Sequence, residues 1–406
     1  MQRDDPAFRE GVGFVLRLAK ALHTHGAPAH RLEEALAMMA AELKVEGHFL
    51  SAPTSLTVAF GEPPDQTLYL LRVDPGAMNL GVLADLDEVL AEFTAHRLTP
   101  AQGQARLDRI LEPHARYAPW LTTLCFGVTA ACTARFFEGG WREVLTAGAI
   151  GIQTGLLLWA LRRRPAAMQL FEPGAATLAS LTACAVTVRW AHASPYIASV
   201  AGLIVLLPGL TLTTALTELG TRNLVSGTAR LSGALLAFLG IGAGLALGAG
   251  IATRIWGSIP QPAPTPLATW TQFIALAIAP FAMTVLFRAR WREAGWIFGA
   301  CVLAFGCARV ATRLLGPELG TFAAAAVSAG AGNLYSRMFN RSAAVLQVPA
   351  ILFLIPGSLG VRSVSSLIAN DVVGGLGFAV SLGLTAVGLA AGILLANVVL
   401  TPRRPL

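Results

Sequence analysis

From residue 118 onward the chain is a succession of apolar stretches, each about twenty residues long, and this pattern constrains the fold more than any other feature. A helix needs about 20 apolar residues to cross the roughly 30 Å of hydrocarbon in a bilayer. Ten stretches approach that length, at 118–136, 143–161, 170–190, 194–217, 224–250, 269–287, 294–313, 319–336, 342–359 and 373–400. The sequence therefore predicts a mostly α-helical, polytopic membrane protein with about ten spans, whose surroundings are the lipid bilayer.

Charge divides the chain near residue 118. Residues 1–117 hold 16 acidic and 11 basic residues, a net charge of −5, whereas residues 118–406 hold 7 acidic and 19 basic residues, a net charge of +12. All 19 of those basic residues are Arg, and they lie between apolar stretches, where such residues set membrane topology. The overall positive charge is therefore not a nucleic-acid signature, and we expect no nucleic-acid partner.

The first segment has the periodicity of a small α+β domain. Apolar residues recur at helical spacing over three segments and alternate over two, which predicts helices at 6–25, 29–46 and 79–97 and strands at 54–60 and 67–73. Thr99 and Gln102 form a capping box that starts a fourth helix, ending near Pro113. This segment has no apolar run long enough to cross a bilayer, so residues 1–117 are predicted to form a soluble cytoplasmic domain.

Residue patterns typical of enzymes are missing from the sequence. The five cysteines lie in apolar stretches without zinc-like or redox spacing, and the cluster of His23, His25 and His30 has poor geometry for a metal. Ser51 and Ser55 have no nucleophile elbow around them, and no G-x-x-x-x-G-K-[ST] phosphate loop occurs. We therefore expect no catalytic residues, no metal and no cofactor, and transport would have to use an ion gradient.

A short motif recurs in the fourth and ninth apolar stretches, as GLIVLLPG at 202–209 and AILFLIPG at 350–357. An offset of five spans is odd, so it would invert one half of the membrane part relative to the other, as in many secondary transporters. The predicted halves are 118–268 and 269–406, each with five spans. Pro and Gly weaken a helix, so breaks are predicted at Pro208, Gly209, Pro356 and Gly357.

The arginines also predict an orientation. If residues 1–117 are cytoplasmic, the cytoplasmic loops hold eleven arginines and the outer loops seven, a moderate excess in the expected direction. Ten spans then leave both termini in the cytoplasm. We expect a multi-pass membrane protein, and the sequence leaves open whether it forms a homo-oligomer.

Ionisable residues at membrane depth are costly, so they are candidates for function. Glu218 follows the first Pro-Gly in a Thr-rich segment, and Arg230 lies within the next span, where the two could pair across adjacent helices. The complete candidate set for substrate or proton binding is Glu218, Arg230, Thr213, Thr214, Asn223, Asn333, Asn370 and Asp371, with Gln347 as a further polar group. The alternative reading places Glu218 and Asp371 at the membrane surface as ordinary helix-end residues.

Several of these segments resemble the bacterial threonine/serine exporter family. The resemblance covers essentially the whole chain and is carried by Pro208–Arg230, by APTSLTVAF at 52–60, by the segment 101–110 and by LIPGS at 354–358. The chain looks like a fusion of two membrane modules that relatives can carry as separate subunits. The resemblance implies a cytoplasmic domain, ten spans and proton-driven efflux of threonine and serine, with a threonine- or serine-like substrate.

Two alternatives remain open at this stage. Two-subunit relatives are associated with dicarboxylate export, but a dicarboxylate needs more than one cation, and Arg230 alone lies clearly inside a span. A membrane-anchored hydrolase or sensor acting through residues 1–117 is an alternative of another class. In the exporter reading, Glu218 carries the coupling proton or binds the substrate ammonium, and Arg230 holds Glu218 or the substrate carboxylate.

Overall fold

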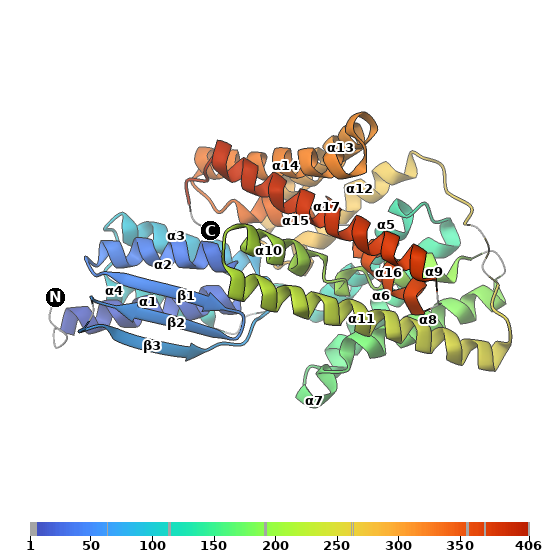
Figure 1. Cartoon of the computed structure of the whole chain (residues 1–406), viewed down its shortest axis with the longest axis horizontal. Helices are drawn as coiled ribbons and strands as arrows, with labels where there is room; N and C mark the ends of the chain where they lie inside the picture. The colour runs from blue at the N-terminus through green and yellow to red at the C-terminus, as the bar shows by residue number, and fades with distance from the viewer. Residues whose placement is uncertain are drawn as a thin grey trace.

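The computed structural model describes residues 6–62, 64–112, 115–190, 193–260, 262, 264–354, 357–368 and 371–404. Residues 6–112, here called the N-terminal region, lie at one end of an elongated molecule, and the helices of residues 115–404, here called the helical part, make up the rest (Figure 1). Most of the chain is α-helical.

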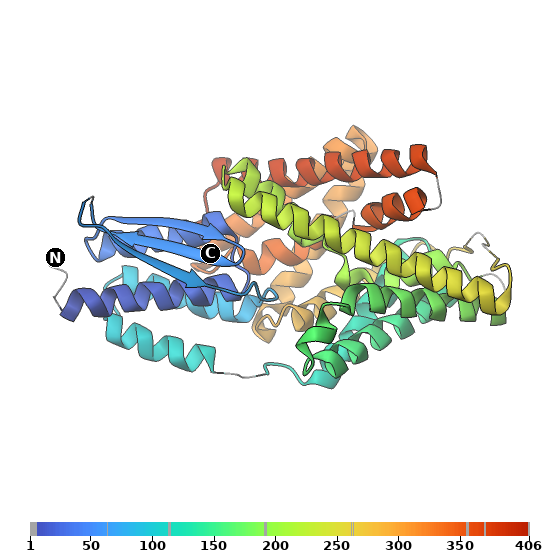
Figure 2. The ribbon, with the colours of Figure 1, turned by 60° about the horizontal axis from the view of Figure 1, so that its bottom comes forward.

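The N-terminal region combines four helices with one sheet. Its elements are α1 (Pro6–Thr24), α2 (Ala29–Glu42), β1 (Gly47–Ala52), β2 (Ser55–Phe60), β3 (Thr67–Arg72), α3 (Leu80–Thr94) and α4 (Pro100–Leu111). The strands are antiparallel in the order β1-β2-β3, with Leu50 opposite Thr57 and Thr57 opposite Leu70. The helices cover one face of the sheet (Figure 2), and their buried apolar side chains, such as Phe14 and Leu36, form a core with Leu56 of β2.

The sequence prediction was wrong about the segment after α2. The helix expected to run to residue 46 ends at Glu42, and residues 47–52 form the unpredicted strand β1. Side chains of β1 do not alternate between apolar and polar, and Leu50 is 54% exposed, so the strand gives no period-two signal. The predicted capping box is confirmed, because Gln102 N donates to Thr99 Oγ1 at 3.3 Å and Thr99 N donates to Gln102 Oε1 at 3.0 Å.

The helical part holds a helix in each of the ten predicted stretches. Its elements are α5 (Pro119–Phe136), α6 (Trp141–Leu161), α7 (Pro165–Met168), α8 (Phe171–Arg189), α9 (Pro195–Gly202), η1 (Ile204–Leu206), α10 (Gly209–Gly220), α11 (Leu224–Trp256), α12 (Thr271–Leu286), η2 (Trp291–Glu293), α13 (Ala294–Leu315), α14 (Pro317–Phe339), α15 (Ala344–Leu354), α16 (Gly357–Ile368) and α17 (Val372–Val399). Within the described residues, six segments are long and apolar enough to cross a membrane, or seven if one bent pair is counted as a span. Large apolar side chains such as Leu236 and Val373 are exposed on these helices, as expected for surfaces that face lipid. The chain is therefore a helical membrane protein with several apolar spans.

The fourth predicted span is broken near the first Pro-Gly. Helix α9 ends at Gly202, and the segment from Ile204 to Gly220 is inclined to it by 51°. Pro208 has no backbone N–H and sits just before the first residue of α10, Gly209. The break places the start of α10 inside the protein.

The predicted break at Pro356 and Gly357 falls on the edge of residues that lie outside the described ones. The structure describes α15 up to Leu354 and α16 from Gly357. Helices α10 and α16 each pack against both α11 and α17. The two long helices α11 and α17 run in opposite directions along the helical part (Figures 1 and 2).

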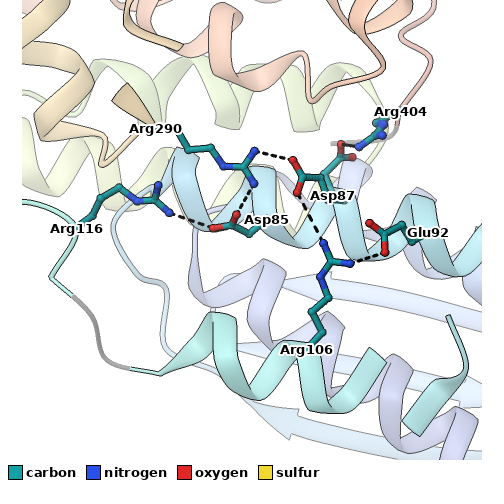
Figure 3. A network of polar contacts seen from close by, with 8 residues as sticks. Asp85, Asp87, Glu92, Arg106, Arg116, Arg290 and Arg404 are labelled. Atoms are coloured by element: carbon teal, nitrogen blue, oxygen red, sulfur yellow. Dashed lines mark hydrogen bonds and ion pairs between the residues drawn. The ribbon is translucent and has the colours of Figure 1, made fainter. Parts of the chain in front are cut away.

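Acidic side chains of α3 join the N-terminal region to the helical part (Figure 3). Arg290 pairs with Asp85 and, at 2.6 Å, with Glu88, and Arg404 pairs with Asp87 at 2.8 Å. Burial alone would raise the pKa of Glu88, but the hydrogen bond and charge of Arg290 lower it. Glu88 therefore stays ionised at neutral pH, and the three ion pairs hold the two parts together.

A backbone hydrogen bond also joins the two parts. Leu80 N donates to Phe287 O at 2.9 Å. A Cβ added to Gly81 would lie 2.4 Å from Arg288 O, so a larger residue cannot fit without movement. The start of α3 is thus fitted directly against the loop between α12 and α13.

Candidate functional site

Glu218 is the fully buried carboxylate at which the N-terminal region meets the broken span. Its Oε1 accepts a hydrogen bond from Ala29 N at 2.8 Å, and its Oε2 accepts one from Ser226 Oγ at 2.8 Å. Arg230 Nε lies 3.1 Å from Oε2, although its N–H does not point at that oxygen, so the contact is an ion pair without a hydrogen bond. The predicted pairing across α10 and α11 is confirmed as geometry. The contact with Ala29 was not predicted.

The contact with Ala29 has a clear physical basis. Ala29 is the first residue of α2, and the unpaired N–H groups at a helix N-terminus carry positive partial charge. Pro28, the residue before it, offers no N–H and no side-chain cap. Glu218 therefore acts as the cap that the N-terminal region itself does not supply.

A close approach of α10 and α11 gives Ser226 and Arg230 access to the same carboxylate. A Cβ on Gly227 would lie 2.7 Å from the Leu219 side chain, so glycine is needed where these helices touch. Asn223 lies in the turn between them, where its backbone N donates to Glu218 O at 2.8 Å. Its side-chain amide donates to Thr221 rather than to the carboxylate.

A cavity of about 100 Å³ lies beside this cluster, between the N-terminal region and the helical part. One water needs roughly 10–15 Å³ of such space, so the cavity has room for several waters or one small solute. Four places in the chain supply its polar lining: the start of α2, helix α10, the start of α15 and the end of α17. The polar lining residues are His30, Arg31, Thr213, Thr214, Thr217, Ser342, Gln347 and Asn397.

Side-chain amides form a connected network along one wall of the cavity. Asn397 Oδ1 accepts from Arg31 Nη2 at 3.2 Å and from Asn333 Nδ2 at 2.9 Å. Gln347 Nε2 donates to Asn333 Oδ1 at 2.8 Å and to Ala329 O at 3.0 Å. The network fixes these side chains from three helices and from the N-terminal region, which makes the wall preorganised.

Two polar atoms of the lining have no hydrogen-bond partner in the described part of the chain, Ser342 Oγ and His30 Nδ1. Ser342 is only 2% exposed. Burial, reinforced by the charges of Arg31 and Arg230, lowers the pKa of His30 to about 4, so this ring is neutral at physiological pH. Buried polar atoms are normally paired, and these two are free to bind a solute.

The predicted site residues fall into three groups. Thr213 and Thr214 line the cavity, and Asn333 supports its wall. Glu218, Arg230 and Asn223 lie behind the wall, next to Thr217. Asp371 does not join them.

Asp371 is far from the cavity. It is exposed, and its side chain caps α17 by accepting from Gly374 N at 3.0 Å. Asn397 lies 26 residues further along α17, which corresponds to about 39 Å at 1.5 Å per residue. Asn370 lies outside the described residues.

Sequence reasoning missed four of the polar lining residues: His30, Arg31, Ser342 and Asn397. His30 and Arg31 belong to the N-terminal region, where hydropathy gives no reason to expect a residue of a membrane cavity. Ser342 and Asn397 are small polar residues near helix ends, a position in which such residues are common. No sequence signal distinguished them.

Family comparisons cover most of the chain. The threonine/serine exporter model ThrE matches residues 13–252, and the second model, ThrE_2, described as Threonine/Serine exporter, matches residues 272–399. The two matches correspond to the two membrane modules expected from the sequence, here fused in one chain.

Curated relatives come from yeasts and are named pheromone-regulated membrane protein 10. The protein of Kluyveromyces lactis is 27% identical over 418 residues, which cover 96% of this chain and 43% of that protein. The protein of Saccharomyces cerevisiae is 28% identical over 371 residues, covering 88% of this chain and 47% of that protein. The chain thus spans about half the length of these relatives or less. No solved structure matches it.

Proposed function

We infer that this chain exports small polar amino acids, because it belongs to the threonine/serine exporter family. The proposed substrates are threonine and serine, and the proposed energy source is the proton gradient. The observation that carries the proposal is the cavity between the N-terminal region, α10, α15 and α17, whose polar lining is made of hydroxyls, amides, one histidine and one arginine.

The charge of the cavity favours a zwitterion over a dicarboxylate. Arg31 is the one cationic side chain among the described lining residues, because His30 is neutral. Arg230, the cation predicted from the sequence, is already paired with Glu218. A dicarboxylate would bring two negative charges to one arginine, whereas an amino acid brings one carboxylate and its own ammonium.

Glu218 is the proposed carrier of the coupling proton. Protonation would remove its charge from Arg230 and replace an acceptor with a donor near Ala29 N. Both contacts hold α2 against the broken span. A proton on Glu218 would therefore loosen the wall of the cavity, which links proton movement to access.

The proposed architecture is a soluble domain of residues 1–117 followed by two inverted five-span halves, 118–268 and 269–406. Recurring contacts support it: α8 packs on α11 as α14 packs on α17, and α6 packs on α9 as α13 packs on α15. The opposite directions of α11 and α17 agree with an inversion. Ten spans follow if α5, α12, α14 and the α9–α10 pair also cross the bilayer.

The proposed orientation places both termini in the cytoplasm of a bacterial cell, with the helices in its inner membrane. Arg290 and Arg404, which the arginine distribution assigns to cytoplasmic segments, contact α3 of the N-terminal region. This agrees with one cytoplasmic end of the molecule that contains the N-terminal region and these segments.

A hydrolase in the N-terminal region has little support. Ser51 and Ser55 would need a neighbouring base, but His23 Nε2 lies 2.8 Å from the backbone oxygen of Ala52. Burial lowers the pKa of His23, so the ring is a poor proton acceptor at neutral pH. Hydrolytic activity of the full chain that is lost on Ser55→Ala would reverse this ranking.

The function is tested with inside-out membrane vesicles that contain the chain, energised with a proton gradient. We expect uptake of labelled threonine, inhibition by unlabelled serine and no inhibition by succinate. Vesicles without the chain are the control. Uptake inhibited by succinate but not by serine would favour the dicarboxylate alternative, and uptake that is insensitive to a protonophore would rule out proton coupling.

A further inference from the structure

Arg31 is a cation of the N-terminal region in the wall of the cavity that this region shares with helices of the helical part. Its side chain is 15% exposed, and its nearest acidic partner, Glu34, is 3.5 Å away and 55% exposed. Burial lowers the pKa of Arg31, and Glu34 offsets this only in part. The charge of Arg31 is therefore weakly compensated, whereas buried charges are normally paired.

The guanidinium group has donors to spare. One nitrogen donates to Asn397 Oδ1 at 3.2 Å and another lies at the distance limit from Glu34. A guanidinium has five N–H donors in a planar fork that matches a carboxylate. Asn397 also accepts from Asn333, so the amide network holds the guanidinium at the cavity wall rather than neutralising it.

Ser342 is the second observation. It lines the same cavity just before α15, is 2% exposed, and its Oγ has no partner among the described residues. A buried hydroxyl without a partner costs stability, so its retention is explained if a solute accepts its hydrogen bond. The N-terminus of α2, where Arg31 lies in the first turn, adds positive potential to this side of the cavity.

We propose that the N-terminal region supplies the cationic anchor for the substrate carboxylate, Arg31, and that Ser342 Oγ, just before α15, is a second donor to the same carboxylate. This assignment rests on the proposed export function. The α-carboxylate of the amino acid binds at the start of α2, and its ammonium faces the hydroxyls of α10 and the amide oxygens. The soluble region is then part of the site rather than an accessory, and it selects for α-amino acids.

The test measures binding to the purified full-length chain in detergent. Labelled L-threonine is displaced by unlabelled L-threonine or by L-threoninol, which carries CH₂OH in place of the carboxylate. Wild-type chain should bind threonine and discriminate strongly against threoninol. Arg31→Gln should weaken threonine binding by about tenfold or more, because a hydrogen bond to a charged group is lost, while threoninol binding changes little.

Three further variants separate recognition from folding. Arg31→Lys keeps the positive charge but lacks the planar set of guanidinium donors, so it should retain part of the discrimination between threonine and threoninol. Ser342→Ala should weaken threonine binding several-fold and leave threoninol binding unchanged. Arg72→Gln removes an exposed arginine of β3 and is the matched control, with wild-type affinity expected for both compounds. Melting temperatures show which variants are folded.

The outcomes are distinct. Unchanged threonine affinity and unchanged discrimination in Arg31→Gln, with wild-type binding present, would overturn this assignment and leave the export function standing. If Arg31→Gln is not folded, the affinity for threonine relative to threoninol is compared in Arg31→Lys and Ser342→Ala instead. An unchanged relative affinity in both variants would overturn the assignment. Wild-type chain that binds no threonine and transports none would instead count against the proposed function and the assignment together.

Discussion

The carboxylate of Glu218 accepts a hydrogen bond at 2.8 Å from the backbone N–H of Ala29, 189 residues earlier in the chain. A broken membrane helix is thereby joined to the first turn of a helix in the N-terminal region. The neighbours of both residues, Thr217 on one side and Pro28 and His30 on the other, line the cavity proposed to hold the substrate. The predictions below concern this junction.

Glu218→Gln should destabilise the chain and abolish the pH dependence of export. The amide keeps one acceptor but leaves Arg230 without its counter-charge, and removing one partner of a buried pair costs about 3–5 kcal/mol. Melting temperature in detergent and threonine transport between pH 6 and pH 8 are the measurements. Glu318→Gln, at an exposed position of α14, is the matched control and should change neither.

Arg230→Gln together with Glu218→Gln should be less damaging to stability than the sum of the single changes, because no uncompensated charge remains. The melting temperatures of the two single variants and of the double variant give this comparison. Strictly additive losses would mean that the two side chains are not coupled.

Gly81→Ala should loosen the docking of the N-terminal region. The new methyl group would overlap Arg288 O, and overpacking of this kind costs about 1–3 kcal/mol. Limited proteolysis between α4 and α5 should become faster, and transport should fall. Gly295→Ala introduces a methyl group where nothing lies within 4 Å, so it should behave as wild type. Equal proteolysis rates for both variants would contradict the fitted contact.

Acidification should lower the stability of the folded chain, because His30 is buried as a neutral ring. Its pKa is about 4 in the folded state against an ordinary 6.5, so the unfolded state binds more protons between these values. The stability contributed by the neutral ring is fully present above pH 6.5 and is lost as the pH falls towards 4. Between pH 6.5 and pH 4 the melting temperature should drop less in His30→Gln than in wild type. His48 has an exposed side chain, so His48→Gln is the control and should show the same drop as wild type.

Pro208→Ala should impair transport more than stability. With an N–H at position 208 the helix can continue through the break, which would move the start of α10 and its threonines. Pro280→Ala is the control, because α12 already runs through Pro280 as one helix. Transport rates normalised to the amount of folded protein compare the two, and equal rates would show that the break is not required.

Periodicity and the placement of charged residues were sufficient to predict most helices and the pairing of Glu218 with Arg230. Those features depend on local pattern or on neighbouring spans. The roles of Ala29 and Arg31 could not be predicted, because they arise where distant segments dock, and a backbone N–H carries no sequence signal at all. Asp371 was a candidate for substrate or proton binding, but in the structure its side chain caps the N-terminus of α17, which is the alternative that the sequence left open.

The most direct test of the central claim is efflux of labelled threonine from preloaded cells that express wild type, Thr214→Val or no chain. Thr214 lines the cavity, and valine replaces only its hydroxyl, with a methyl group of similar size. Wild type should accelerate efflux, and Thr214→Val should raise KM roughly two- to tenfold, the equivalent of one hydrogen bond, while Thr228→Val, at an exposed position of α11, should match wild type. Efflux that is the same with and without the chain, when the chain is present in the membrane, would contradict the account.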